Sequence, residues 1–303
     1  MRIGLYLNEP SGPDAIAKLE ENIAGAAGDG FSSAWLSNIF GVDALTALAA
    51  AGPRVPGIEL GTAVVPTYPR HPAVLAQQAL TASLALGGRL TLGIGLSHRL
   101  VIEDMYGYRY DRPARHMREY LSVLGPLLRG ERADVDGETV AAHVELSTPR
   151  AGEVPLLVAA LAPRMLGVTG RAADGTILWM TGPRTVAEHV VPAITEAARE
   201  AGRPAPRIVC ALPVAVTGDE AAARERAAKI YSIYGQLPSY RAMLDREGAQ
   251  GPADVAIVGG EDEVAERIAG LAAAGVTDFV AAVFVSGDDA VRTRRLLPTL
   301  ASS

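Results

Sequence analysis

Short apolar runs alternate with longer helical stretches along the whole chain, and this alternation restricts the fold more than any other feature. The apolar runs are rich in aliphatic and β-branched residues, which is typical of strands buried on both faces. Strands joined by helices cross over with one hand, so the pattern predicts a parallel sheet covered by helices. The predicted strands are 2–7, 33–38, 58–66, 90–97, 155–161, 176–181, 207–216 and 278–285.

Eight parallel strands alternating with helices over 303 residues are typical of an α/β fold of the (β/α)8 TIM-barrel type. We predict one barrel domain spanning 1–303. A doubly wound sheet is the alternative, but its first turn would carry Gly-x-Gly-x-x-Gly, and residues 8–13 read Asn-Glu-Pro-Ser-Gly-Pro. The predicted helices are 14–28, 43–51, 73–86, 115–129, 163–173, 185–201, 219–246, 261–274 and 287–300.

Two segments exceed what a minimal barrel needs. Residues 131–154, after the fourth helix, contain the step Asp136-Gly137 between short apolar runs, which is typical of a hairpin. Residues 235–260, before the eighth strand, are interrupted by glycine and proline and predict a broken helix and a loop near the barrel mouth. We interpret both as insertions in the one domain.

Composition narrows the classes of partner. The chain has 28 basic and 34 acidic residues, a net charge of −6 and no basic stripe, which disfavours nucleic acid. No apolar run approaches the ~18 residues that span a bilayer, and the first strand starts too early for a signal peptide, so no membrane is expected. The single cysteine, Cys210, lies in an apolar run and suggests a buried thiol in a reducing, cytoplasmic compartment.

A barrel places its active site at the carboxyl ends of the strands. These ends hold amides, hydroxyls, small residues and one histidine, without the carboxylate pair of a glycosidase, a nucleophile elbow or a strand lysine. The histidines, at 71, 98, 116, 143 and 189, lack metal-ligand spacing, so no metal site is expected. Such a mouth is suited to a large, flat cofactor that supplies the chemistry itself.

Five short segments carry a resemblance to a known family. They are Ala34-Trp35-Leu36, Asp43-Ala44-Leu45-Thr46, the stretch from Gly61 to His98, the stretch from Ala159 to Leu166, and Ala173-Asp174-Gly175. In this order and spacing they resemble the bacterial luciferase-like monooxygenase superfamily, and within it the oxidoreductases that use the deazaflavin coenzyme F420. The resemblance implies a TIM barrel, usually a homodimer, that binds flavin or deazaflavin at its mouth and acts on a small molecule.

The resemblance also implies which residues contact the ring of the cofactor. Ala63-Val64 matches a step where F420-dependent relatives have a non-proline cis peptide that supports the face of the ring. An ordinary trans strand is the alternative. Gly95-Leu96-Ser97-His98 matches a loop whose backbone amides meet the polar edge of the ring.

Two residues are the candidates for catalysis by this resemblance. His98 stands where sugar-phosphate dehydrogenase relatives have a proposed proton-donating glutamate, and histidine can act as an acid near neutral pH. A helix-capping or packing role for His98 is the alternative. Asn38 replaces the active-site histidine of several relatives. An amide cannot act as an acid or base, but it can hydrogen-bond the cofactor or the substrate.

Two further segments match the loops that hold the phosphate on the ribityl chain. They are Ala160-Leu161-Ala162 and Thr181-Gly182-Pro183, and free amides at helix N-termini attract anions. The basic residues that bind sugar phosphate in the dehydrogenases have no evident equivalents, so glucose 6-phosphate is a poor candidate substrate. Residues 103–115, with three tyrosines at 106, 108 and 110, are a candidate lid, and packing on the rim is the alternative.

The leading hypothesis is an F420-dependent oxidoreductase, more specifically an F420H2-dependent reductase. Hydride would pass between C5 of the deazaflavin and a small, mostly apolar organic substrate, with His98 or water supplying the proton. An FMN-dependent monooxygenase on the same scaffold is one alternative, and a non-catalytic flavin- or deazaflavin-binding protein is another. The apolar residues assigned to the mouth are Phe40, Trp179, Met180, Phe284 and Val285.

Overall fold

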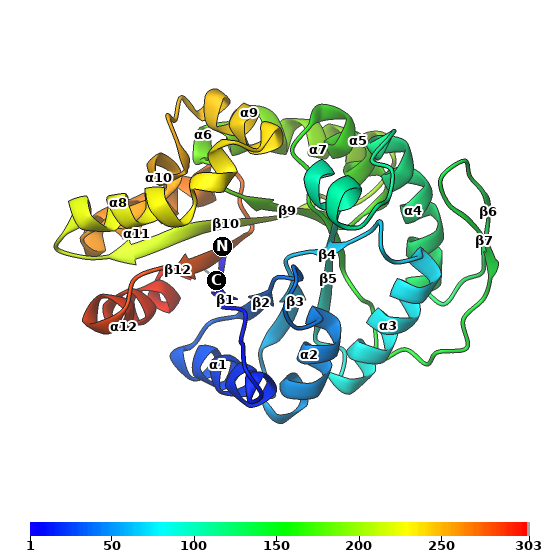
Figure 1. Ribbon diagram of the computed structural model, residues 1–303, viewed down its shortest axis with the longest axis horizontal. Coiled ribbons are helices and arrows are strands. Elements are labelled where there is room, and N and C mark those ends of the chain that lie inside the picture. The colour runs from blue at the N-terminus through cyan, green and yellow to red at the C-terminus, as the bar shows by residue number, and fades with distance from the viewer. Residues whose placement is uncertain (302–303) are drawn as a thin grey trace.

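A closed ring of parallel strands forms the centre of the computed structural model, which describes residues 1–301, and helices surround it (Figure 1). Each strand pairs with the next around the ring, and the last strand, β12, pairs with β1 to close it. This confirms the predicted TIM barrel. The barrel strands are β1 (Arg2–Leu7), β2 (Ser33–Leu36), β3 (Glu59–Thr62), β5 (Leu90–Gly95), β8 (Leu156–Val158), β9 (Gly175–Trp179), β10 (Arg207–Val216) and β12 (Asp278–Val283).

The helices on the outside follow the predicted order with two differences. The prediction of one helix over 219–246 is wrong, because the chain divides there into α8 (Glu220–Ile230), the turn η4 (Ser232–Gly235) and α9 (Pro238–Glu247). Proline fits the first turn of a helix but not its interior, so a new helix starts at Pro238. The sixth helix begins earlier than predicted, as α6 (Pro183–Thr185), η3 (Val186–Val190) and α7 (Val191–Glu200).

The other helices lie close to their predicted bounds. They are α1 (Ala15–Asp29), α2 (Ala44–Ala51), α3 (Pro72–Ala85), α4 (Pro113–Leu128), α5 (Pro163–Ala172), α11 (Glu261–Ala273) and α12 (Gly287–Leu296), with the short turns η1 (Gly52–Arg54), η2 (Leu100–Met105) and η5 (Leu297–Leu300). Among the residues described, none of the helices is long and apolar enough to cross a membrane.

The predicted third strand, 58–66, is interrupted in its middle. β3 ends at Thr62, the Ala63–Val64 peptide is cis, and β4 (Val65–Pro66) then continues the pairing with β5. The predicted cis peptide is therefore confirmed. Glycines on β5 make room for this bulge, because a Cβ on Gly93 would lie 2.0 Å from the Thr62 carbonyl oxygen and a Cβ on Gly95 would lie 2.6 Å from Val64.

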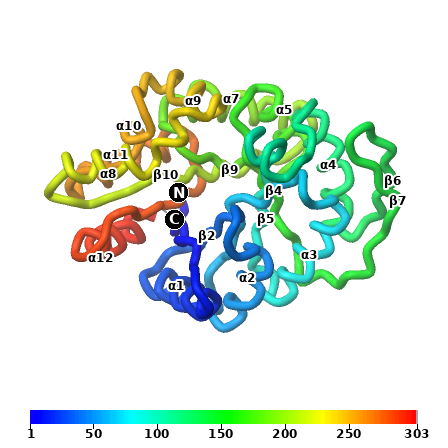
Figure 2. Tube along the Cα trace, viewed as in Figure 1, coloured from blue at the N-terminus to red at the C-terminus, as the bar shows by residue number. Residues whose placement is uncertain are grey.

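Both predicted insertions are present. β6 (Ala133–Asp136) and β7 (Ala141–Val144) form an antiparallel hairpin outside α3 and α4, as predicted (Figure 2). The second insertion contains α9 and α10 (Pro252–Val255), but also a strand, β11 (Ile257–Gly259), that pairs in parallel with the end of β10. The prediction of only a broken helix and a loop is wrong there. Three residues are too short a run to show a strand period.

The amino-terminal end of the barrel is closed by an ion-pair network in which Asp278 is buried and Arg207 and Glu59 are half-buried. Arg207 on β10 donates to Asp278 on β12 at 2.6 Å and to Glu59 on β3 at 2.8 Å. Its guanidinium carbon lies 5.7 Å from the centre of the Trp35 ring on β2. This network joins strands across the interior, and the large cavity of the molecule lies at the opposite, carboxyl end.

Candidate active site

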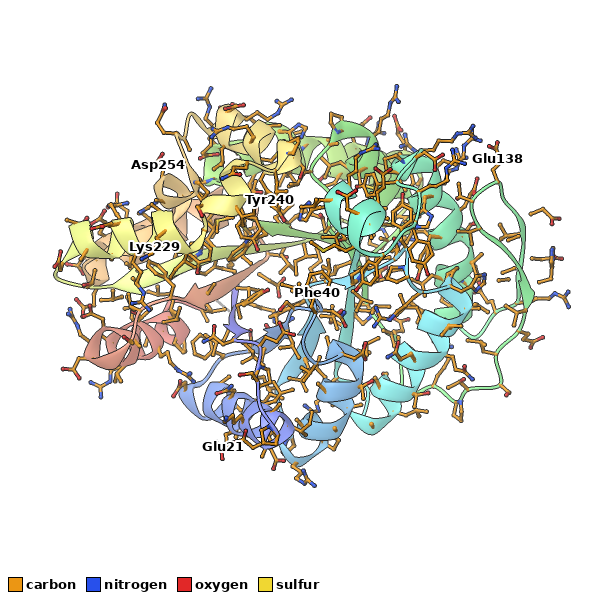
Figure 3. All side chains as sticks on the ribbon, viewed as in Figure 1. Glu21, Phe40, Glu138, Lys229, Tyr240 and Asp254 are labelled. Atoms are coloured by element: carbon orange, nitrogen blue, oxygen red, sulfur yellow. The ribbon has the colours of Figure 1, made fainter. Side chains whose placement is uncertain are left out.

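A cavity of about 970 Å³ opens at the carboxyl ends of the barrel strands. The strands supply mostly small side chains to it, while loops and the second insertion supply larger ones. Figure 3 labels two of the latter, Phe40 after β2 and Tyr240 on α9, which lie over the middle of the barrel. The volume and shape suit a ligand with a flat, extended ring system. The small strand residues are Ala63, Val64, Gly95, Ala159 and Ala211.

The polar groups of this cavity are donors and neutral side chains. Within the described part of the chain, its lining contains no aspartate, glutamate, lysine or cysteine. One histidine, His98, and three arginines are the only lining residues that can carry a positive charge. The protein therefore offers no carboxylate, thiol or amine here as a nucleophile. Cys210 is fully buried elsewhere, and burial raises the pKa of its thiol to about 12.

Most of the predicted site residues come together around this cavity. The strand-end residues, the loop after β5 and the loop after β8 all contribute to its lining. The predicted residues that line it are Asn38, Ala63, Val64, Gly95, Leu96, Ser97, His98, Ala160, Leu161 and Ala162, and those that do not are Thr181, Gly182 and Pro183.

The second predicted phosphate loop is already occupied by a side chain of the protein. Glu247, at the end of α9, accepts hydrogen bonds from the backbone N–H of Thr185 at 2.7 Å and of Arg184 at 3.2 Å. It also accepts one from the Thr185 hydroxyl at 2.7 Å. Thr181 itself is buried, and its hydroxyl donates to the Trp179 carbonyl. The amides expected to attract a phosphate are thus satisfied by a carboxylate from the insertion.

His98 lies half-buried in the loop between β5 and η2. Its ring centre is 5.8 Å from that of Tyr240, and its carbonyl accepts from the Ile102 N–H. Within residues 1–301 its imidazole makes no hydrogen bond and does not cap η2. Burial lowers the pKa of His98 below its usual value of 6.5, so the ring is mostly neutral at pH 7.

Asn38 is fixed by the helix that follows it. Its Oδ1 accepts the backbone N–H of Ala44, the first residue of α2, at 2.9 Å. Because the oxygen is used in this way, the NH2 group is the free end of the amide. No acceptor for that NH2 group is present among the residues described. Asn38 therefore presents hydrogen-bond donors at the cavity.

Aromatic residues that sequence reasoning missed form one wall of the cavity. Tyr6 on β1 stacks on Trp179 at 5.6 Å, and Tyr234 lies 5.1 Å from Tyr240 between ring centres. Burial raises the pKa of Tyr6 to about 12, so its hydroxyl stays protonated at neutral pH. The polar hydroxyl of Tyr6 inside a predicted buried strand could have identified it as a candidate cavity residue. Tyr240 comes from the second insertion and Tyr234 from η4 just before it, and the sequence did not specify where these segments lie.

Only some of the residues assigned to the candidate lid and to the apolar mouth line the cavity. Tyr106 and Tyr110 line the cavity, but Tyr108 does not and is exposed. The ring of Tyr106 lies 6.2 Å from that of Phe40. Of the five apolar residues assigned to the mouth, Phe40 and Trp179 line the cavity, whereas Met180, Phe284 and Val285 do not.

A model of the family described as luciferase-like monooxygenase matches residues 2–288, and the chain belongs to this family. The chain is 27% identical over 249 residues to a 5,10-methylenetetrahydromethanopterin reductase of Methanolobus tindarius, covering 82% of this chain and 76% of that one. It is 36% identical over 166 residues to an F420-dependent glucose-6-phosphate dehydrogenase of Nocardia farcinica, covering 52% and 48%. The solved structure of the coenzyme F420-dependent tetrahydromethanopterin reductase of Methanopyrus kandleri has the same fold, with a TM-score of 0.82, 23% identity and coverage of 98% and 97%.

Proposed function

We propose that this protein is an F420-dependent oxidoreductase that acts as a reductase of a small, mostly apolar organic molecule. The observation that carries the proposal is the large cavity, whose lining within residues 1–301 contains no carboxylate, thiol or amine. Chemistry at such a site has to come from a bound cofactor. The names of the relatives support F420 as that cofactor.

The residues around the cavity fit a deazaflavin. Small side chains at 63–64 and at Gly95 leave a surface on which a flat ring can lie. The NH2 group of Asn38 is a donor for the polar edge of the ring. The indole Nε1 of Trp179 is buried and makes no hydrogen bond of normal geometry to another group of residues 1–301. The loop 160–162, before α5, is the remaining phosphate site. When bound, the deazaflavin would supply hydride transfer at C5.

The residues of the chain position the substrate and the proton. Phe40, Tyr106 and Ile233 are exposed apolar groups that line the mouth, where they exclude water from an apolar substrate. His98 faces the same space without a hydrogen-bond partner in residues 1–301, so its imidazole is free to hold the proton that the substrate gains.

Parallel titrations with F420 and FMN test the cofactor. Binding of F420 with quenching of its fluorescence, and little binding of FMN, is the expected result. Binding of FMN but not F420 would support the monooxygenase alternative instead. Reoxidation of F420H2 by a panel of uncharged quinones and enones then separates a reductase from a non-catalytic carrier, which would bind F420 tightly and turn over none of them.

We also infer that the protein is a homodimer in the cytoplasm. The resemblance to dimeric relatives supports the dimer, and α3 exposes the apolar residues Val74 and Leu84. The single buried cysteine suits a reducing compartment. Light scattering of the purified protein measures the first property, and a monomeric mass would contradict it.

A further inference from the structure

A groove of about 480 Å³ lies between α4 and α5 and continues the cavity. Arg115 and Arg164 line both spaces. Arg118, one turn further along α4, and Arg171, near the end of α5, line the groove alone. We call these four residues the arginine groove. It runs outward over the surface from the mouth of the proposed cofactor site.

The positive charge of the arginine groove is only partly neutralised by the residues that the structure describes. Arg118 and Arg164 are exposed and have no ion-pair or hydrogen-bond partner in residues 1–301. Arg115 shares a single carboxylate, Glu138, with the neighbouring Arg112. Figure 3 shows Glu138 at the tip of the hairpin. Arg171 pairs with Glu200. Arginine is thus in excess here, in a chain whose net charge is −6.

The positions of these arginines oppose the stability of the helices that carry them. Arg164 lies in the first turn of α5, which has no acidic residue, and the positive end of the helix dipole repels a cation there. Arg115 and Arg118 are three residues apart on α4, so their side chains are neighbours on the helix surface and their like charges repel each other. An anionic ligand in the groove would attract each of these arginines and so offset both repulsions.

We propose that the arginine groove binds the extended anionic tail of the bound cofactor. This proposal rests on the proposed function, because F420 carries a phosphodiester followed by a chain of glutamates, whereas FMN ends in a single phosphate. Guanidinium groups bind phosphate and carboxylate with two parallel hydrogen bonds. The ring occupies the cavity, and the tail leaves it past Arg115 and Arg164 to reach Arg118.

The test compares three forms of the deazaflavin by fluorescence titration: F420 with its glutamate chain, the form without glutamates, and the riboflavin-like chromophore without phosphate or glutamates. The variant is Arg118→Gln/Arg164→Gln, and the matched control is Arg295→Gln, an exposed arginine on α12 with no ion pair within residues 1–301. We expect the double variant to lose about tenfold in affinity for glutamylated F420, from two exposed charge contacts, and to bind the chromophore as before. High salt should remove the same difference.

The outcomes separate the two proposals. Equal affinity of wild type and double variant for glutamylated F420 would overturn the groove and leave the proposed function standing. An equal loss for all three forms would also overturn the groove, since it would indicate a distorted cavity. Failure of the wild type to bind any form would overturn the proposed function and the groove with it. Competition by free oligoglutamate that spares the chromophore would support the groove, because it separates the tail site from the ring site.

Discussion

The imidazole of His98 differs from those of the other histidines because it makes no hydrogen bond or ion pair within residues 1–301, although its ring lies near that of Tyr240. Within residues 1–301 the other four are engaged in contacts that maintain the fold. Burial lowers the pKa of His116 to about 4, and paired carboxylates raise that of His143. The partners of the other histidines are Thr67 and Tyr68 for His116, Asp134 and Asp136 for His143, the Ala73 N–H and the Ala141 carbonyl for His71, and the Leu161 carbonyl for His189.

Replacing His98 with alanine should slow turnover on the order of 100-fold while the affinity for F420 changes little. Burial lowers the pKa of His98, so the imidazolium becomes populated at a lower pH than for a fully exposed histidine. If the imidazolium donates the proton, kcat of the wild type rises as the pH falls and the profile of the variant is flat. Steady-state rates between pH 5 and 8 measure this. Unchanged turnover at all pH values would rule out the acid role.

At the scale of elements, the second insertion both contacts a helix of the barrel and lines the cavity. Glu247 at the end of α9 satisfies the first amides of α6, and Tyr240 on the same helix lines the cavity. The sequence predicted the insertion but not its contact with α6, because a carboxylate 62 residues away has no local signature. The same limit explains the missed β11, whose pairing with β10 is a tertiary contact.

Glu247→Ala should lower the free energy of unfolding by about 1–3 kcal/mol, because the Thr185 N–H would lose its acceptor, whereas the Thr185 hydroxyl keeps the Met243 carbonyl at 3.3 Å. Urea unfolding measures this loss. The matched control is Glu225→Ala on α8, an exposed glutamate with no hydrogen bond, which should leave stability nearly unchanged. A loss no larger than that of the control would show that the cap contributes nothing.

At the scale of the whole molecule, the two ends of the barrel differ in what fills them. The amino-terminal end is filled by Arg207 and its carboxylates, and the carboxyl end is left open with small residues. Asp278 is nearly inaccessible, with 3% of its side chain exposed, and it pairs with both Arg207 and Arg2. This separation allows stability and ligand binding to be altered independently.

Arg207→Leu should destabilise the fold by about 3 kcal/mol, because removing one partner leaves buried carboxylates incompletely paired. Thermal or urea unfolding measures the loss, and F420 affinity should not change. Arg199→Leu removes an exposed pair on one helix face and should have a much smaller effect. A comparable loss in the two variants would contradict the role of the network.

The sequence by itself determined the barrel, the hairpin and the residues at the strand ends, because buried strands and amphipathic helices leave local periodic signals. By resemblance it also indicated the cis peptide at Ala63–Val64 and the loop 95–98. Only the tertiary structure decided which amides were free. It assigned those of α6 to Glu247, brought Tyr6 and Tyr240 to one cavity, and placed unpaired arginines of α4 and α5 side by side. Such contacts join residues far apart in the chain, and no local pattern encodes them.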